Sequence, residues 1–167
     1  MIMRAILHGI FLILFMIIQA TWIDTISVFG VKPNLFAVYI VVTSCFCQKN
    51  ESVVTGFVFG FILDILIGKV LGVNAVLLML LGFFTAYFCE KVIRKNNVFI
   101  VMLITLIITF IYELFYYIIA FLGDLQFKEA FVGTLLPECV YNGIAAMPIY
   151  FLIKKVSGKL WDNSEER

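Results

Sequence analysis

Asp64 is the residue in this sequence with the clearest chemical potential, because it is a carboxylate inside an otherwise apolar and glycine-rich stretch, GFVFGFILDILIGKVLG (56–72). Glycines recur every fourth residue on both sides of it, at Gly56, Gly60, Gly68 and Gly72. On a helix this spacing places the glycines and the carboxylate along one stripe. In a bilayer, small residues let a neighbouring helix approach closely. The stripe therefore predicts a helix-packing face with a carboxylate at its centre.

Two further carboxylates, Glu113 and Glu138, interrupt apolar runs, and Asn142 follows Glu138 by one helical turn. A charged side chain near the middle of a bilayer costs about 2.5 to 3.5 kcal/mol on insertion scales, so such residues usually face protein or a cavity. We expect Asp64, Glu113 and Glu138 to lie in the outer half of the membrane, in a polar core. They could simply hydrogen-bond helices together, or they could form a ligand pocket, a proton relay or a partner-docking site. Exchange of Asp64 for asparagine should separate these possibilities, because an amide preserves hydrogen bonding but cannot titrate.

The composition predicts an integral membrane protein. Of the 167 residues, 63% are hydrophobic and 14% are charged, and the mean hydropathy is +1.10. The chain is therefore far more apolar than a soluble domain of this size, which needs apolar residues only for its core. The apolar runs predict an all-α bundle of six transmembrane helices in residues 1–153, with the first run retained as a span, followed by a polar cytoplasmic tail at 154–167. The predicted spans are 5–23, 34–47, 53–67, 70–89, 98–122 and 134–153.

The distribution of basic residues predicts the orientation, because lysine and arginine gather in cytoplasmic loops. With six spans, nine of the twelve basic residues fall on the side of the two termini and three fall on the other side. The three are Lys32, Lys69 and Lys128. Both termini are therefore expected in the cytoplasm.

Several classes of function are disfavoured by what the sequence contains. The net charge of +1 gives no reason to expect nucleic acid as a partner. The four cysteines show no zinc-ligand pairing with the single histidine, His8, and are expected to be small buried hydrophobic residues. Neither a nucleophile with a nearby base nor a phosphate-binding loop is evident. We therefore expect no catalytic residues, no metal, no cofactor and no enzymatic activity.

The segment GFVFGFILDILIGKVLGVNA (56–75), together with Pro137, Glu138, Tyr141 and Asn142, resembles the bacterial rod shape-determining MreD family. The resemblance implies a non-catalytic protein of the bacterial cytoplasmic membrane that maintains rod shape within the cell-elongation machinery. It also implies MreC as a partner, with MreB, RodA and the transpeptidase partner of RodA as direct or indirect partners, and membrane lipid around the helices. The fold is expected to be similar to that of the substrate-binding subunits of energy-coupling-factor transporters.

The residues that match the family motif are Gly56, Gly60, Asp64, Gly68, Gly72 and Asn142, to which the resemblance assigns architecture or partner docking. A partner helix is expected to bind at the outer ends of the spans and at their apolar faces. Two alternatives remain open. The chain could be the substrate-binding membrane subunit of a vitamin-type transporter, or it could bind a lipid-linked precursor.

Overall fold

The structure, a computed structural model, describes residues 2–21, 31–67, 70–92, 97–122 and 131–160. The described residues form six helices, which confirms the predicted all-α fold. The helices are α1 (Ile2–Thr21), α2 (Leu35–Ser44), α3 (Lys49–Ile67), α4 (Val73–Val92), α5 (Val98–Leu122) and α6 (Phe131–Leu160). The predicted likeness to transporter subunits is not tested by this architecture and stays a prediction.

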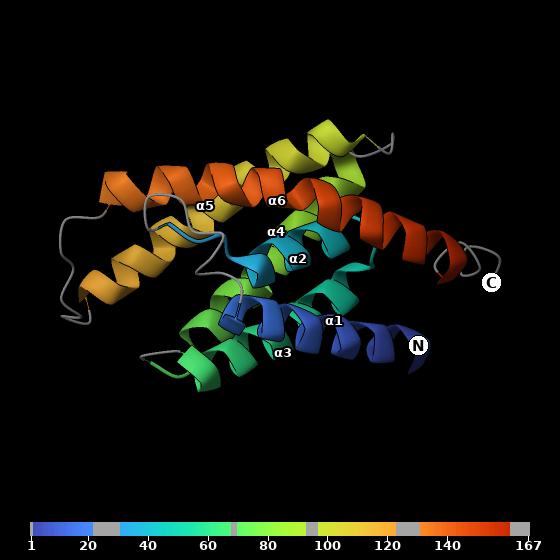
Figure 1. Ribbon diagram of the computed structural model, residues 1–167, viewed down its shortest axis with the longest axis horizontal. Coiled ribbons are helices and arrows are strands. Elements are labelled where there is room, and N and C mark those ends of the chain that lie inside the picture. The colour runs from blue at the N-terminus through green and yellow to red at the C-terminus, as the bar shows by residue number, and fades with distance from the viewer. Residues whose placement is uncertain (1, 22–30, 68–69, 93–96, 123–130, 161–167) are drawn as a thin grey trace.

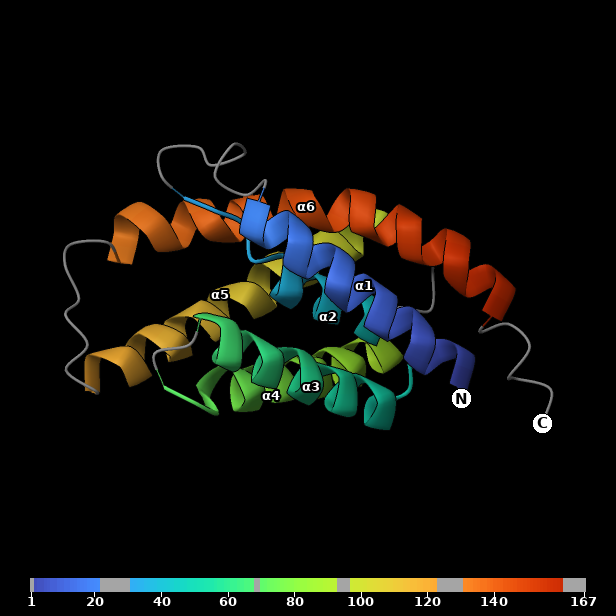
Figure 2. The same ribbon diagram turned by 60° about the horizontal axis from the view of Figure 1, so that its bottom comes forward.

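Successive helices run in alternating directions, so the bundle has two distinct ends (Figures 1 and 2). The start of α1 and the end of α6 lie at the same end, which we call the termini end. The turn from α3 to α4 lies at the opposite end, which we call the far end. Among the described basic residues near helix ends, the termini end holds Arg4, Lys49, Lys91, Lys154 and Lys155, whereas Lys32 lies before the start of α2 at the far end. Five others used to predict the orientation lie outside the described residues: Lys69, Arg94, Lys95, Lys128 and Arg167.

Helix α2 forms the centre of the bundle. All of its residues from Phe36 to Ser44 are buried, and it contacts each of the other five helices. Its ten residues rise about 15 Å, about half the thickness of a bilayer core. The run predicted as a span at 34–47 is therefore a short helix enclosed by its neighbours, and the chain leaves the helix at Cys45.

Three of the helices in the described part of the chain are long and apolar enough to cross a membrane. The qualifying windows are Val73–Lys91, Val98–Ile119 and Leu135–Val156. The predicted span at 98–122 coincides with α5 (Val98–Leu122), whereas α6 is longer than the predicted 134–153. That all six helices cross the membrane stays a prediction.

The outer faces of the helices are strongly apolar. On α1 the exposed residues Ile6, Ile10, Ile13 and Ile17 form a stripe with helical spacing, and Val54, Phe61 and Ile65 are exposed on α3. Contiguous exposed apolar surface of this kind is unusual on a soluble monomer. It is the surface that lipid or a partner's transmembrane helix would cover.

Candidate functional site

The glycine stripe forms the contact between α3 and α4. A Cβ atom added at Gly60 would lie 2.6 Å from the Cα atom of Ala75, and one added at Gly56 would lie 2.9 Å from the carbonyl carbon of Leu78. Gly82 on α4 makes the same kind of close contact with α3, because a Cβ there would lie 2.6 Å from the carbonyl oxygen of Ser52. Only hydrogen fits at these positions, so the glycines set the close approach of the two backbones.

The other glycines of the motif differ from Gly56 and Gly60. Gly72 lies in the turn before α4 with a φ of +96°, and a Cβ added there would meet nothing within 4 Å. Glycine adopts this left-handed conformation without steric cost, so Gly72 serves the turn and not the packing. Gly68 lies outside the described residues.

Asp64 caps the start of α4 from across the hairpin turn. Its Oδ2 atom accepts hydrogen bonds from the backbone nitrogens of Gly72 and Ala75, both at 2.9 Å. Its Oδ1 atom accepts from the backbone nitrogen of Asn74 at 3.0 Å and from Asn74 Nδ2 at 2.9 Å. The first backbone N–H groups of a helix have no partner within the helix and carry partial positive charge. The carboxylate therefore satisfies these groups and joins α3 to α4.

Asn74 extends this connection to α5. While its amide donates to Asp64, its Oδ1 atom accepts a 2.8 Å hydrogen bond from the hydroxyl group of Tyr112. Both Asn74 and Tyr112 are buried. Sequence reasoning missed Asn74, because it lies two residues after the turn glycine Gly72, inside the first turn of α4, and not at the N-cap position where asparagine is a recognisable signal.

A second group of polar side chains joins α2, α5 and α6. Asn142 Oδ1 accepts a 2.8 Å hydrogen bond from the backbone nitrogen of Asn34. The side chain of Asn34 caps α2 by accepting from the backbone nitrogen of Ala37 at 3.1 Å. Asn142 is fully buried, and its Nδ2 atom has no hydrogen-bond partner. Asn142 thus fixes the start of the central helix.

Glu113 on α5 and Glu138 on α6 lie against each other within this second group. Their carboxyl groups are hydrogen-bonded, and the side chain of Asn34 interacts with both Glu113 and the neighbouring Tyr112. The exposed fraction of Glu113 is 6% and that of Asp64 is 2%. The Asp64 group and the Glu113 group both lie at the far end of the bundle, where they form one network of buried and partly buried side chains that we call the far-end network. Its members are Asp64, Asn74, Tyr112, Asn34, Glu113, Glu138 and Asn142.

The termini end carries a separate set of polar contacts. Glu51 in the first turn of α3 receives a hydrogen bond from Arg4 at 3.2 Å, and its other oxygen lies 3.2 Å from His8 Nε2. The hydrogen bond with His8, helped by the charge of Arg4, outweighs burial and holds the pKa of Glu51 below its ordinary value. Lys49 and Glu90 form an ion pair at 2.6 Å across α3 and α4. These contacts join α1 and α4 to the start of α3.

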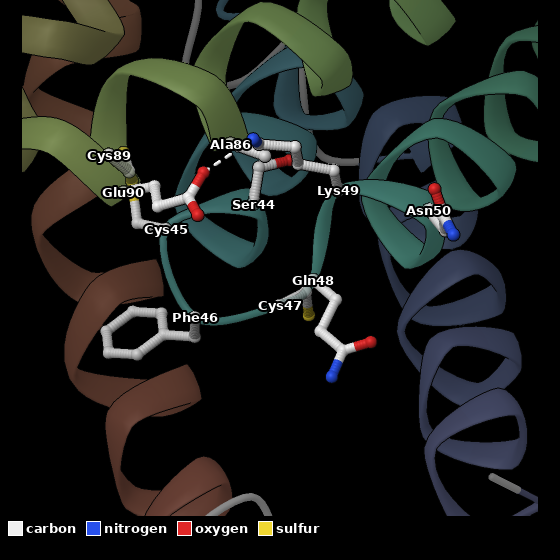
Figure 3. Close-up of a pocket in the computed structure, with 10 residues that line it drawn as sticks. All are labelled: Ser44, Cys45, Phe46, Cys47, Gln48, Lys49, Asn50, Ala86, Cys89 and Glu90. Atoms are coloured by element: carbon white, nitrogen blue, oxygen red, sulfur yellow. Dashed lines mark ion pairs between the residues drawn. A yellow bond between two sulfur atoms is a disulfide. The ribbon is translucent and has the colours of Figure 1, made fainter.

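A cavity of about 430 Å³ opens at the termini end (Figure 3). Its wall comes from the chain between the end of α2 and the start of α3, and from the end of α4. Ser44 lines it, and the Ser44 hydroxyl oxygen is buried without a hydrogen-bond partner. The Lys49–Glu90 ion pair lies at its margin (Figure 3).

The prediction that the four cysteines are simply small buried hydrophobic residues is wrong for two of them, which are bonded to each other. Cys45 and Cys89 form a disulfide between the end of α2 and α4, with their Cα atoms 5.2 Å apart. The fold brings these two cysteines together from a sequence separation of 44, which no local pattern could show. Cys139 is buried as expected, and Cys47 is partly exposed.

The fold and the far-end network define an all-helical membrane protein in which buried polar side chains join the helices to one another. The family model of the rod shape-determining protein MreD matches residues 2–159. The chain therefore belongs to the MreD family. No curated protein and no solved structure matches it.

Proposed function

We propose that this protein is a non-catalytic component of the cell-elongation machinery in the bacterial cytoplasmic membrane. In this role it maintains rod shape by binding MreC and thereby helps to organise peptidoglycan synthesis. Membership of the rod shape-determining MreD family carries the proposal. MreB, RodA and its transpeptidase partner would be reached directly or through MreC.

The far-end network supports an architectural role for the motif residues. A solute-binding site needs polar groups that face the solute. Here the Asp64 carboxylate makes four hydrogen bonds within the protein, and the Tyr112 hydroxyl donates to Asn74. These groups hold helices together, which favours a rigid scaffold over a vitamin-type transporter subunit.

The outer helix faces offer the surface for a partner. The described chain between α2 and α3 and before α4 is short, so a partner in the membrane would contact mainly helix surfaces there. The exposed faces of α1, α3 and α5 are apolar along their length, as Ile10, Phe61 and Leu103 illustrate. A single transmembrane helix of MreC could pack on such a face, with its external segment against the far end.

Depletion of the protein in its native host tests the shape role. We expect rounded cells with mislocalised wall synthesis, and recovery of the rod shape when the wild-type chain is restored. Cells that keep their rod shape but acquire a nutrient requirement would contradict the proposal and support transport.

Site-specific photocrosslinking in the membrane tests the proposed contact with MreC. A photoreactive residue would replace Ile10, Phe61 or Leu103 in turn, and Asn50 at the termini end would provide the matched exposed control. Crosslinks to MreC from at least one helix face, and none from Asn50, are expected. Crosslinks from Asn50 alone would place the contact on the cytoplasmic loops and refute the proposed docking face.

A further inference from the structure

The fold gathers a nitrogen, a sulfur and an oxygen ligand at the termini end. They belong to His8 on α1, Cys47 in the turn between α2 and α3, and Glu51 in the first turn of α3. The imidazole nitrogen, the thiol sulfur and a carboxylate oxygen all lie within 4.8 Å of one another. Figure 3 shows Cys47 on the turn that borders the cavity. Cys47 and Glu51 are close in the sequence, but His8 lies 43 residues before Glu51, so only the fold reveals the complete group.

The His8 ring is already oriented for metal binding. Its Nδ1 atom lies 2.7 Å from the hydroxyl oxygen of the buried Tyr39, and the two rings meet edge to face. This leaves Nε2 directed at Glu51, 3.2 Å from Oε1. Metal-binding histidines typically use one ring nitrogen as ligand while the other donates to a fixed partner. Tyr39 would be that partner.

We propose that His8 Nε2, Cys47 Sγ and Glu51 Oε1 form a binding site for a divalent transition-metal ion, with Zn²⁺ as the best match. A mixed set of imidazole, thiolate and carboxylate suits Zn²⁺, which accepts all three in tetrahedral geometry. Three protein ligands leave a fourth position for water. The negative charges of the thiolate and the carboxylate balance the charge of the ion.

The distances fit after a small adjustment. Ligand atoms around a tetrahedral zinc ion lie about 3.3 to 3.8 Å apart, given zinc–ligand bonds of about 2.0 to 2.3 Å. The His8–Glu51 pair at 3.2 Å is already close to this spacing. The widest separation of 4.8 Å must shorten by about 1 Å, which side-chain rotation can supply. Arg4 binds the other carboxylate oxygen of Glu51, Oε2, so Oε1 remains available.

Metal binding requires one proton to move within the His8 ring and one to leave the Cys47 thiol. Without metal, the neutral tautomer that carries its proton on Nε2 lets His8 donate to Glu51 and accept from the Tyr39 hydroxyl at Nδ1, which satisfies all three groups. On binding, the imidazole proton moves to Nδ1 and is donated to the Tyr39 oxygen, while the Cys47 thiol releases its proton to solvent. The ion then takes the place of the proton between His8 and Glu51.

The ion would fasten α1 to the rest of the bundle. α1 packs mainly on α2, and its contacts with Glu51 come from Arg4 and His8. A metal shared by α1, the α2–α3 turn and α3 would fix the first helix in place. Because Cys47 also lines the cavity, an ion could reach the site from the aqueous side.

Metal binding by the full chain, purified in mild detergent with a reductant, tests this site. After chelator treatment, Co²⁺ is added and the near-ultraviolet absorption of a cobalt–thiolate bond is recorded. Zn²⁺ stabilisation is measured as a shift in the unfolding temperature, because a ligand of the folded state stabilises it. We expect one ion per chain, the cobalt–thiolate band and a higher unfolding temperature with Zn²⁺.

Matched variants assign the ligands. Cys47→Ser should abolish the band, and His8→Ala should abolish the Zn²⁺ stabilisation. Cys139→Ser and the double variant Cys45→Ser/Cys89→Ser remove the other thiols and should keep both signals. If His8→Ala fails to accumulate, protection of Cys47 from maleimide by Zn²⁺ in the wild-type chain serves instead. Absence of the band and of any protection by Zn²⁺, or a band that survives Cys47→Ser, would overturn the proposal.

Discussion

The side-chain amide of Asn74 donates a 2.9 Å hydrogen bond to the carboxylate of Asp64. The same carboxylate accepts from backbone N–H groups at the start of α4, so this helix is capped by an acid from the preceding helix. Because Asn74 is the second residue of α4 and Asp64 lies in the last turn of α3, this contact closes the hairpin at the far end. The glycines Gly56 and Gly60 bring the two helices together over the rest of their length. Carboxylate and glycines therefore serve one purpose, the rigid pairing of α3 with α4.

Asp64→Asn should destabilise the protein strongly, contrary to the expectation that an amide preserves the hydrogen bonding. All four partners of Asp64 are donors, two at each oxygen. Either orientation of an asparagine amide points its NH₂ group at two of these donors. With two charge-assisted hydrogen bonds lost, we expect a loss of about 3 kcal/mol or more. The unfolding temperature in detergent measures this, with Glu90→Gln as the control exchange, because the ion pair of Glu90 with Lys49 is solvent-exposed and such pairs contribute little to stability. An unchanged unfolding temperature for Asp64→Asn would show that the cap is dispensable.

The stripe and its neighbours also show what the sequence could and could not predict. The four-residue spacing predicted the packing face, because a helical period is visible in one segment. The sequence could not show that Asp64 reaches the start of the next helix, or that Asn74 and Asn34 complete the network, since those contacts depend on the turn and on tertiary packing. The run at 34–47 could not show that its helix is short and enclosed by its neighbours, because a buried central helix and a lipid-facing helix are equally apolar. The Cys45–Cys89 contact and the His8, Cys47 and Glu51 group arise only when distant segments meet.

Gly60→Ala should separate α3 from α4. The new methyl group would meet backbone atoms of Asn74 and Ala75, which cannot move aside as a flexible side chain can. We expect a loss of about 1 to 3 kcal/mol or failure to accumulate in the membrane. Gly9→Ala is the matched control, because nothing lies within 4 Å of a Cβ there and alanine favours the helix. Equal accumulation and equal unfolding temperatures for the two variants would rule out the close packing described here.

Tyr112→Phe tests the connection between α4 and α5. The exchange removes the hydroxyl donor and leaves the buried Asn74 Oδ1 atom without it. Loss of one partner of a buried hydrogen bond costs about 1 to 3 kcal/mol, so the unfolding temperature should fall. Tyr87→Phe is the control, because its hydroxyl contacts Lys91 at an exposed position. If Tyr87→Phe lowers the unfolding temperature as much as Tyr112→Phe does, the network does not carry this stability.

Because Glu113 and Glu138 lie against each other, we expect the protein to tolerate glutamine at either position but not leucine. A hydrogen bond between two carboxyl groups needs a proton on one of them, and the NH₂ group of glutamine supplies an equivalent donor. Glu113→Gln should therefore keep both the unfolding temperature and the rod shape of complemented cells. Glu113→Leu should lose both, because it leaves Glu138 partly buried without this partner, at a cost of about 1 to 3 kcal/mol. Glu138→Gln and Glu138→Leu should reproduce the same contrast from the other side. If the glutamine variants fold as wild type yet fail to restore rod shape, the pair has a role in proton exchange that an architectural function does not provide.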